Sequence, residues 1–461
     1  MKKIVGLSLI ACLALSMVFM ATGCSSKSSA KKIKVLLYMQ EHEKKIYEKI
    51  VADFAEEHKD EIAGIDFEIT TQEEYNTKMI AAMTANDMPD VFYIGPESVR
   101  SYVDNGRALP LDSYVDASAV NNLWPAIIGA YRYDGNEVGK GSLYCLPKDL
   151  SCFAFAYNKD IFDEAGLPYP DPNKPYTYAE FLDVCQKLTK DTDGDGEVDQ
   201  WGVANADAFG MTPYLYGNGG HFLNEDYTKV VVNEDKAFRE AFQYYCDLTN
   251  KYHVTPSVEQ DTALGGYQRW LDGQVAFYAC GTWDVAAFMD KNTFPYNWDL
   301  CGWPVGPSGD GRSTAWLGTV GYAVSSKAKN PELCAKLIQK LSTDLDGQRA
   351  VSGETTGHSL QLPNIRDYAK SNFKNLVNEG KIPYASNVDV IFGYVEGNDK
   401  YNGIFTETTY TYNGEWWNIF LEGVANCKNG SVKVDDYLAS VQPKMQKALD
   451  TAIELQNSAK K

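Results

Sequence analysis

The sequence predicts an α/β protein built of two lobes. A chain of 461 residues is too long to fold around one ordinary hydrophobic core, which favours two lobes. Residues 33–94 alternate strand and helix patterns at the spacing of parallel βαβ units. Residues 273–284, GQVAFYACGTWD, pass from a helix-stopping glycine into a short apolar run typical of a buried strand. Together these patterns favour mostly parallel sheets flanked by helices.

An aromatic ring and a carboxylate follow the end of that central strand. In open α/β sheets, ligands bind outside the carboxyl ends of the strands. Trp283 and Asp284 come directly after Gly281 and are therefore candidates for contact with a sugar. Position alone leaves a second interpretation open, in which Trp283 is a core residue that covers the strand end.

The composition argues against a nucleic acid or an anionic lipid surface as the partner. The formal net charge is −19, so the chain lacks the basic character that such partners require. It contains 30 Tyr and 9 Trp, and flat rings of this kind suit uncharged ligands such as sugars. This composition favours a protein that binds such a ligand, but it does not establish that function.

Residues 1–23 have the pattern of a targeting segment. A Lys2-Lys3 pair precedes an uncharged apolar run, slightly too short for a comfortable membrane span. The run ends in ATGC, and residues 24–32 are a Ser/Lys-rich tether. This arrangement resembles a bacterial lipoprotein signal, which implies that Cys24 is lipidated and becomes the N-terminus. Ala21 stands where that pattern usually has Leu, and ordinary cleavage with free secretion is the alternative.

The eight cysteines beyond Cys24 form no CxxC pair, and most lie in apolar runs. Free cysteine in such a run behaves as a small hydrophobe. An even number outside the cytoplasm permits disulfides. We expect mostly reduced, buried thiols, because a chain of this size does not need covalent links to fold.

Two loops of the first lobe carry candidate carboxylates. The strand expected at 33–38 is followed by Glu41, and the strand expected at 89–94 is followed by Glu97. Both loops lie at carboxyl ends of parallel strands, on the same rim. A carboxylate there can accept hydrogen bonds from two adjacent sugar hydroxyls. A solvated loop is the alternative for each.

A short acidic loop in the middle of the chain carries a possible oxygen ligand at every second residue. Thr177 and Glu180 form a capping box that opens a helix, and the loop DTDGDGEVD follows that helix. This is how a short loop wraps Ca²⁺, but Gly202 stands where an EF-hand has its bidentate glutamate. A tight turn without metal is equally compatible. The calcium ligands would be Asp191, Asp193, Asp195, the carbonyl of Glu197, and Asp199.

The C-terminal part supplies further aromatic candidates. Trp316 precedes an expected strand at 319–324 in a Gly-flanked loop. Trp416 and Trp417 fall in an expected helix, so one ring should be core, and Trp416 is the better ligand candidate. The final helix, 435–455, should kink at Pro443.

Six groups of motifs in order resemble the extracytoplasmic solute-binding proteins of ABC transporters, family 1, the sugar-binding type. The resemblance covers about residues 33–455. Single motifs are degenerate, and their order behind a lipoprotein-like signal makes them specific. The motifs are PDVFY, YCLPKD followed by YNKD and AGLP, PYTYAEF followed by KLTKDTDGDGEVDQWG, GQVAFYACGTW, WPVGP, and WLGTVGYAVSSKAKNPELCAKL.

The resemblance implies a two-lobed periplasmic-binding-protein-like (type II) fold with a cleft at the interface. One lobe would comprise 33–148 and about 302–365, the other 149–301 and about 366–461. It implies a monomer that needs no cofactor, performs no chemistry and presents a sugar to ABC permease subunits. Ser151 stands where related proteins can carry an acid, which puts that contact in doubt. The implied cleft residues are Glu41, Asp90, Glu97, Trp283 and Trp316.

A surface-anchored carbohydrate hydrolase is the competing hypothesis. It needs two carboxylates about 5–10 Å apart across a cleft. The many acidic residues leave room for such a pair, but no HExxH or nucleophile-elbow motif occurs. A passive structural protein would predict repeats, and the sequence has none.

Overall fold

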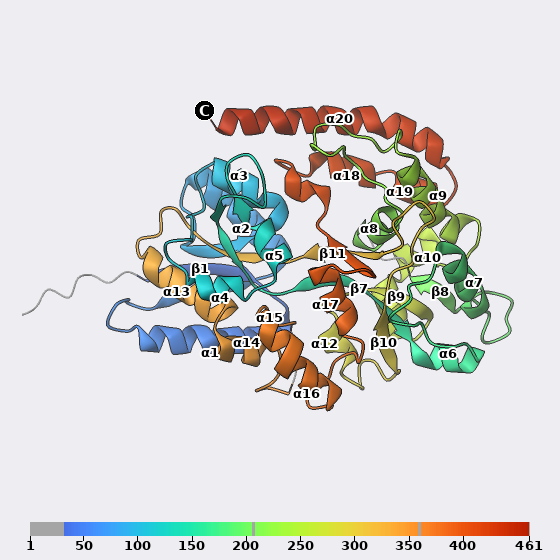
Figure 1. The fold of residues 1–461 in the computed structure, drawn as a ribbon, viewed down its shortest axis with the longest axis horizontal. Coiled ribbons are helices and arrows are strands. Elements are labelled where there is room, and N and C mark those ends of the chain that lie inside the picture. The colour runs from blue at the N-terminus through green and yellow to red at the C-terminus, as the bar shows by residue number, and fades with distance from the viewer. Residues whose placement is uncertain (1–31, 205–207, 358–360, 461) are drawn as a thin grey trace, which may run out of the picture.

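A computed structural model of the chain describes residues 32–204, 208–357 and 361–460. Cys24 and the targeting segment therefore lie outside the described residues. The described chain forms two groups of elements around separate sheets, as Figure 1 shows. The predicted two-lobed α/β architecture is confirmed. No helix in the described ranges has both the length and the apolar character to span a membrane.

The first sheet has five strands in the order β2-β1-β3-β12-β6. β1 pairs in parallel with β2 and β3, as the βαβαβ pattern predicted. β12 pairs antiparallel with β3 and β6. The strands are β1 (Ile33–Tyr38), β2 (Ile65–Thr70), β3 (Val91–Ile94), β6 (Cys145–Pro147) and β12 (Gly321–Val324).

The second sheet has six strands, with β13-β11-β7-β9-β8 in a row and β10 against β7. Only the β8–β9 and β11–β13 pairs are parallel. β7 runs antiparallel to its neighbours β9, β10 and β11. The strands are β7 (Ser151–Asn158), β8 (Trp201–Ala204), β9 (Val275–Gly281), β10 (Trp298–Cys301), β11 (Ser313–Gly318) and β13 (Tyr401–Ile404).

Both sheets are therefore mixed, where the sequence predicted mostly parallel ones. The reason is the way in which the chain changes lobes. β7 and β12 are entered directly from the other lobe, so each begins at the rim where its neighbours end. A strand that begins at that rim must run opposite to the strands that finish there.

Two crossover segments lie side by side between the sheets. The Lys148 backbone N–H donates to the Val320 carbonyl at 2.7 Å, and the Thr319 hydroxyl donates to the Asp149 carbonyl at 2.8 Å. Residues 148–150 connect β6 to β7, and residues 319–320 connect β11 to β12. The sequence placed the return to the first lobe near residue 302, but β11 still pairs with β7. The observed crossover follows Gly318.

Helices surround both sheets (Figure 1). The capping box predicted at the start of α7 is present, with Thr177 and Glu180 bonded reciprocally. The eight cysteines beyond Cys24 are buried free thiols, as expected. The helices near the first sheet are α1 (Glu41–Glu57), α2 (Gln72–Ala85), α3 (Val99–Asp104), α4 (Ala117–Asn121), α5 (Pro125–Ala130), α13 (Pro331–Ser342) and α14 (Leu345–Val351). The others are α6 (Lys159–Ala165), α7 (Tyr178–Leu188), α8 (Ala208–Gly217), α9 (Lys236–Asn250), α10 (Val258–Ala263), α11 (Gly266–Leu271), α12 (Val285–Phe288), α15 (Arg366–Tyr368), α16 (Lys374–Asn378), α17 (Asp389–Glu396), α18 (Glu415–Leu421), α19 (Val424–Lys428) and α20 (Val434–Ala459).

The last helix, α20, extends over both lobes (Figure 1). It packs against α9 and α18 of the second lobe and reaches α3 of the first. Near its end, the Gln456 amide donates to the Asp104 carboxylate at 3.2 Å and to the Tyr133 hydroxyl at 2.9 Å. Pro443, where the sequence predicted a kink, lies inside a helix that continues on both sides. α20 therefore ties the two lobes together along one edge.

Candidate ligand-binding cavity

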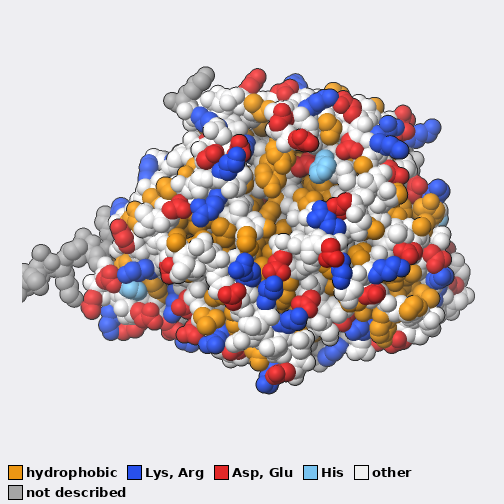
Figure 2. Space-filling view, in the orientation of Figure 1, with side chains coloured by type: hydrophobic (Ala, Val, Ile, Leu, Met, Phe, Trp, Pro, Cys, Tyr) orange, Lys and Arg blue, Asp and Glu red, His pale blue; other side chains and the backbone are white. Residues whose placement is uncertain are grey.

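A cavity of about 1400 Å³ lies between the rims of the two sheets. Its walls come from the carboxyl ends of β1, β3, β11 and β13, from the crossover segments, and from one side of α2, α18 and α20. Figure 2 shows hydrophobic side chains gathered along the middle of the displayed face, between the two lobes. The cavity thus occupies the place where strand ends of both lobes meet.

Two tryptophan rings form the aromatic wall of the cavity. Trp283 follows β9 directly, and Trp316 belongs to β11. Their ring centroids lie 6.2 Å apart, and the ring planes meet at 86°. Phe153 of β7 packs near both, with centroid distances of 5.6 Å to Trp283 and 6.2 Å to Trp316. Both tryptophans are only partly buried, so each has ring surface available to the cavity.

The C-terminal segment contributes a third indole, and it is not the one that the sequence favoured. Trp417 lines the cavity together with Phe405, whereas Trp416 is 0% exposed. The Trp416 indole N–H donates to the Thr411 hydroxyl at 3.1 Å inside the core. Adjacent residues of a helix point about 100° apart, so only one of the pair can face the cavity. The expectation that Trp416 faces the cavity is therefore wrong, and Trp417 is the residue of the pair that lines it.

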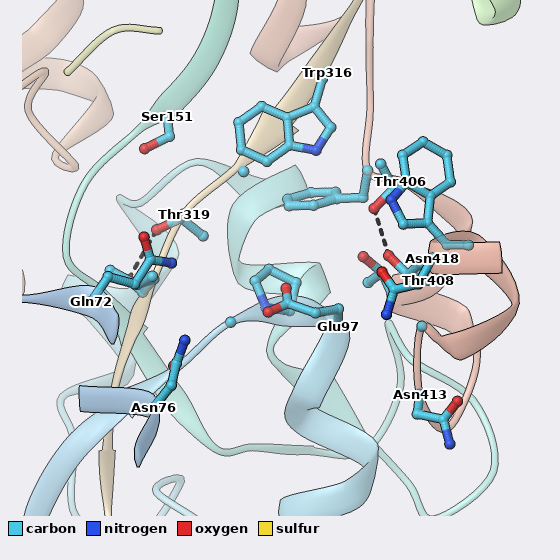
Figure 3. Close-up of a pocket in the computed structure, with 18 of the residues that line it drawn as sticks. Gln72, Asn76, Glu97, Ser151, Trp316, Thr319, Thr406, Thr408, Asn413 and Asn418 are labelled. Atoms are coloured by element: carbon cyan, nitrogen blue, oxygen red, sulfur yellow. Dashed lines mark hydrogen bonds between the residues drawn. The ribbon is translucent and has the colours of Figure 1, made fainter. Parts of the chain in front are cut away.

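Polar side chains face these rings from the other walls, as Figure 3 shows. Gln72 and Asn76 lie one turn apart on α2, and Glu97 follows β3. The Glu97 carboxyl is open to the cavity, but the surrounding walls limit its hydration and raise its pKa. The segments after β13 and around the start of α18 add Thr406, Thr408, Thr409, Asn413 and Asn418.

A buried ion cluster lies where the cavity meets the crossover. The Lys148 ammonium is 2.7 Å from the Glu43 carboxylate and 3.9 Å from that of Asp149. Burial would lower the pKa of Lys148, but the two carboxylates outweigh it and raise that pKa. Burial also raises the pKa of Asp149, whose carboxylate accepts a hydrogen bond from the Ser151 hydroxyl at 2.9 Å. Glu43 also caps α1 through the Gln40 backbone N–H at 2.8 Å.

The predicted cleft residues divide into two groups. The structure brings Glu97, Trp283 and Trp316 together on the cavity wall. It places Glu41, Asp90 and Asp284 off that wall, together with Trp416. Whether the first group contacts a ligand stays a prediction.

Each displaced carboxylate has a structural reason for its position. The Glu41 side chain is 86% exposed and pairs with Lys44. Asp90 precedes β3, so it lies at the amino end of the strand and accepts the Lys34 backbone N–H at 2.9 Å. Asp284 turns back and accepts the Gly281 backbone N–H at 3.3 Å. The cavity instead receives Gln40, the N-cap of α1, and Glu43 from its first turn.

Several wall residues could have been found from the sequence. Gln72 and Asn76 follow β2 and share one helical face. The strand-end rule selected candidates after the first and third strands, and the same rule applied after the second strand would have selected these two residues. Thr406, Thr408 and Thr409 follow β13, a strand that the apolar pattern did not reveal. Lys148 and Asp149 belong to the YCLPKD motif, but the sequence alone assigned no role to either residue.

The acidic loop lies away from the cavity. Carboxylate oxygens of Asp191, Asp193 and Asp195 lie within 4.8 Å of one another. Asp191 accepts backbone N–H groups of two loop glycines at 2.6 and 2.8 Å. Asp199 accepts the N–H and the hydroxyl of Thr192 at 2.9 and 2.7 Å. Hydrogen bonds within the loop, from its backbone and side chains, thus already hold it in a closed turn.

Comparisons with known proteins agree with this architecture. Residues 40–344 match the family model of the bacterial extracellular solute-binding proteins. An arabinooligosaccharide-binding protein of Halalkalibacterium halodurans is 24% identical over 287 residues, and the alignment spans 59% of each chain. A diacetylchitobiose-binding protein of Streptomyces coelicolor is 22% identical over 331 residues, covering 71% of this chain and 72% of that one.

Solved structures show the same fold. An ABC substrate-binding protein from Listeria monocytogenes, in complex with cycloalternan, superposes with a TM-score of 0.74 at 18% identity, covering 91% of this chain and 99% of that one. A cyclic α-maltosyl-1,6-maltose-binding protein from Arthrobacter globiformis gives a TM-score of 0.70 at 19% identity and the same coverage. The family model spans well over half of the chain, and it agrees with the family indicated by the ordered motifs. The chain belongs to the bacterial extracellular solute-binding proteins.

Proposed function

We propose that the protein binds a sugar or oligosaccharide in the cavity between its lobes and delivers it to an ABC-type importer. The observation that carries this proposal is the wall itself. Three indoles, from the segment after β9, from β11 and from α18, face amide, hydroxyl and carboxyl groups across one cavity. Aromatic faces with a few convergent polar groups are what a carbohydrate requires. Family membership implies that the chain works outside the cytoplasm.

The two kinds of wall would perform different tasks. Ring faces of the sugar would stack on Trp283, Trp316 and Trp417, which separates a carbohydrate from small polar solutes. Amide and carboxyl groups such as Asn76 and Glu97 would hold the hydroxyls. A sugar that lacks one of these hydroxyls would leave a buried polar group unpaired, and this cost selects among sugars.

The size of the cavity favours a ligand of more than one sugar ring. Pockets for drug-sized molecules occupy about 300–1,000 Å³, whereas this cavity measures about 1400 Å³. The relatives are named for arabinooligosaccharide and diacetylchitobiose, which supports the same class. Closure of the lobes about the paired crossovers would enclose the ligand.

The hydrolase alternative finds little support in the cavity. A glycosidase needs one carboxyl group free to protonate the leaving oxygen and a second free to act as nucleophile or base. Glu43 contacts Lys148 at 2.7 Å and also caps α1, and Asp149 accepts a hydrogen bond from Ser151. Glu97 and Glu415 are the other carboxylates that line the cavity. Two of the cavity carboxylates therefore already serve the structure.

One experiment separates the two functions. The purified protein is mixed with mono- and oligosaccharides, including arabino-oligosaccharides and diacetylchitobiose, and its melting temperature and the recovered sugar are both measured. A binder gives a higher melting temperature with one class of sugar and returns that sugar intact. Shortened products would support the hydrolase, and no shift with any sugar would contradict the proposal.

Two finer assignments, the lipid anchor and the calcium site, stay predictions. Lipidation of Cys24 would hold the receptor at the outer face of the cytoplasmic membrane, near its permease subunits. A Cys24→Ala variant should then leave the membrane fraction, whereas free secretion predicts no difference from the wild type. Ca²⁺ in the 191–199 loop would be structural and would contribute nothing to the cavity.

A further inference from the structure

Three side chains on the cavity wall fold back over glycines two residues away. Trp283 covers Gly281, Trp316 covers Gly318, and the Glu97 carboxylate covers Gly95. A Cβ atom built on any of these glycines would meet the covering side chain well inside the 3.0 Å that Cβ contacts essentially never breach.

Backbone conformation does not explain these glycines. None of the three is among the described residues with positive φ. Gly95, for example, has φ −76° and ψ 154°, which any residue can adopt. What the positions require is the missing Cβ, because the space that it would fill is occupied by an indole ring or a carboxylate.

The two tryptophan–glycine pairs flank the same strand. In the β7 register, Phe153 lies opposite Gly281 of β9, and Ser151 lies opposite Gly318 of β11. Residues i and i+2 of a strand share one face, and so do directly opposed residues of an antiparallel pair. Phe153, Ser151 and the two glycines therefore share the cavity face. The two indoles approach each other over the start of β7.

We propose that Gly95, Gly281 and Gly318 are positioning residues of the sugar site, each holding a wall side chain flat against the backbone by leaving room for it. This inference rests on the proposed function. A methyl group at Gly281 or Gly318 would turn the indole out into the cavity, where open space accepts it at little cost in stability. The same change would destroy the perpendicular arrangement of the rings. At Gly95 it would push the flexible carboxylate of Glu97 off its place.

The test compares Gly281→Ala and Gly318→Ala with Gly265→Ala. Gly265 is a suitable control because a Cβ there meets nothing within 4 Å and its φ is −65°. We expect the first two variants to keep the wild-type apo melting temperature within a few degrees and to bind the sugar about ten-fold or more weakly, as the loss of an aromatic contact would do. The control should bind as the wild type does.

A double-mutant cycle isolates the positioning role from general damage. If Gly281 acts through Trp283, Gly281→Ala should cause no further loss of the residual affinity that a Trp283→Ala protein shows at high sugar concentration. Equal losses in both backgrounds would overturn the proposal, as would wild-type affinity of Gly281→Ala.

A measurement without sugar keeps the inference separable from the proposed function. In protein labelled with 5-fluorotryptophan, the Trp283 resonance is assigned by its loss in Trp283→Phe. That ¹⁹F resonance should move in Gly281→Ala and stay in place in Gly265→Ala. If the resonance moves in Gly281→Ala but the wild type binds no sugar, the proposed function is contradicted and the positioning role is supported. If the resonance does not move, the positioning role is contradicted, whether or not the wild type binds a sugar.

Discussion

The indole rings of Trp283 and Trp316 stand at 86° to each other, with their centroids 6.2 Å apart. A flat ligand cannot lie on both faces at once. Neighbouring sugar rings that turn relative to each other can, so under the proposed function this pair would hold adjacent units of one oligosaccharide. Trp283 follows β9 and Trp316 lies in β11, and these two strands flank β7. The geometry therefore belongs to the second lobe alone and does not depend on how far the lobes close.

Trp283→Ala should abolish the sugar-dependent rise in melting temperature and leave the apo fold intact. The ring is only partly buried and adjoins the cavity, so its removal leaves a larger opening and no sealed void. Circular dichroism of the apo protein checks the fold, and titration calorimetry checks the affinity. An unchanged thermal shift would remove Trp283 from the site.

The adjacent pair Trp416 and Trp417 should behave in opposite ways. Trp416→Ala opens a cavity in the core and should lower the free energy of unfolding by about 3–5 kcal/mol. Trp417→Ala should cost less stability and more sugar affinity, because this ring faces the cavity. Urea unfolding and sugar titration of both variants measure the two effects. Similar losses of stability in both would contradict the placement.

The ion pair at the crossover should stabilise the fold strongly. Lys148→Met leaves the carboxylates of Glu43 and Asp149 buried without their cation, and loss of one partner of a buried pair costs about 3–5 kcal/mol. Adding Glu43→Gln removes one of these charges while a glutamine can still cap α1. The double variant should recover part of the unfolding free energy. A double variant less stable than Lys148→Met would exclude this electrostatic explanation.

Stability should depend on pH through His221. Its ring lies 2.9 Å from the buried Glu407 carboxylate, and this hydrogen bond raises the pKa of His221 above 6.5. A raised folded-state pKa gives a stabilisation that is complete below 6.5 and is lost as the pH rises through the raised value. The ring is 51% exposed, so solvent reduces the effect.

The comparison that isolates this contribution is wild type against His221→Gln. The difference in melting temperature should be largest near about pH 6 and should shrink towards about pH 9. A difference that is constant over this range, or that grows with pH, would contradict the assignment. Glu407→Gln should remove the same pH dependence, because it removes the charge that His221 senses.

Chelation of divalent cations should leave sugar affinity unchanged. The 191–199 loop does not line the cavity, and its carboxylates already accept hydrogen bonds from the loop itself. Titration in the presence and absence of EDTA compares the dissociation constants. A change of ten-fold or more, about 1.4 kcal/mol, would mean that a cation is coupled to the binding site.

Local patterns were sufficient for the first lobe and for two of the wall residues. Alternating strands and helices predicted β1 to β3, and the strand-end rule selected Glu97 and Trp283. Trp316 was selected as part of a loop before a strand, whereas it lies within β11. These inferences need only neighbouring residues and one general property of parallel sheets.

What could not be predicted depends on contacts between distant segments. The pairing of β11 with β7 sets the crossover at Gly318, and no local pattern carries that information. The choice between Trp416 and Trp417 depends on how α18 is rotated against α20. Asp90 was selected by its motif, although its place before β3 already puts it at the opposite end of the sheet.

The most direct test of a receptor that holds carbohydrate without altering it is equilibrium binding followed by analysis of the ligand. The protein is saturated with the oligosaccharide that gives the largest thermal shift, kept for many hours, and unfolded, and the released sugar is measured by mass spectrometry. We predict stoichiometric recovery of the original oligosaccharide from the wild type and none from Trp283→Ala. Recovery of cleaved sugar from the wild type, or equal recovery from both proteins, would contradict the account.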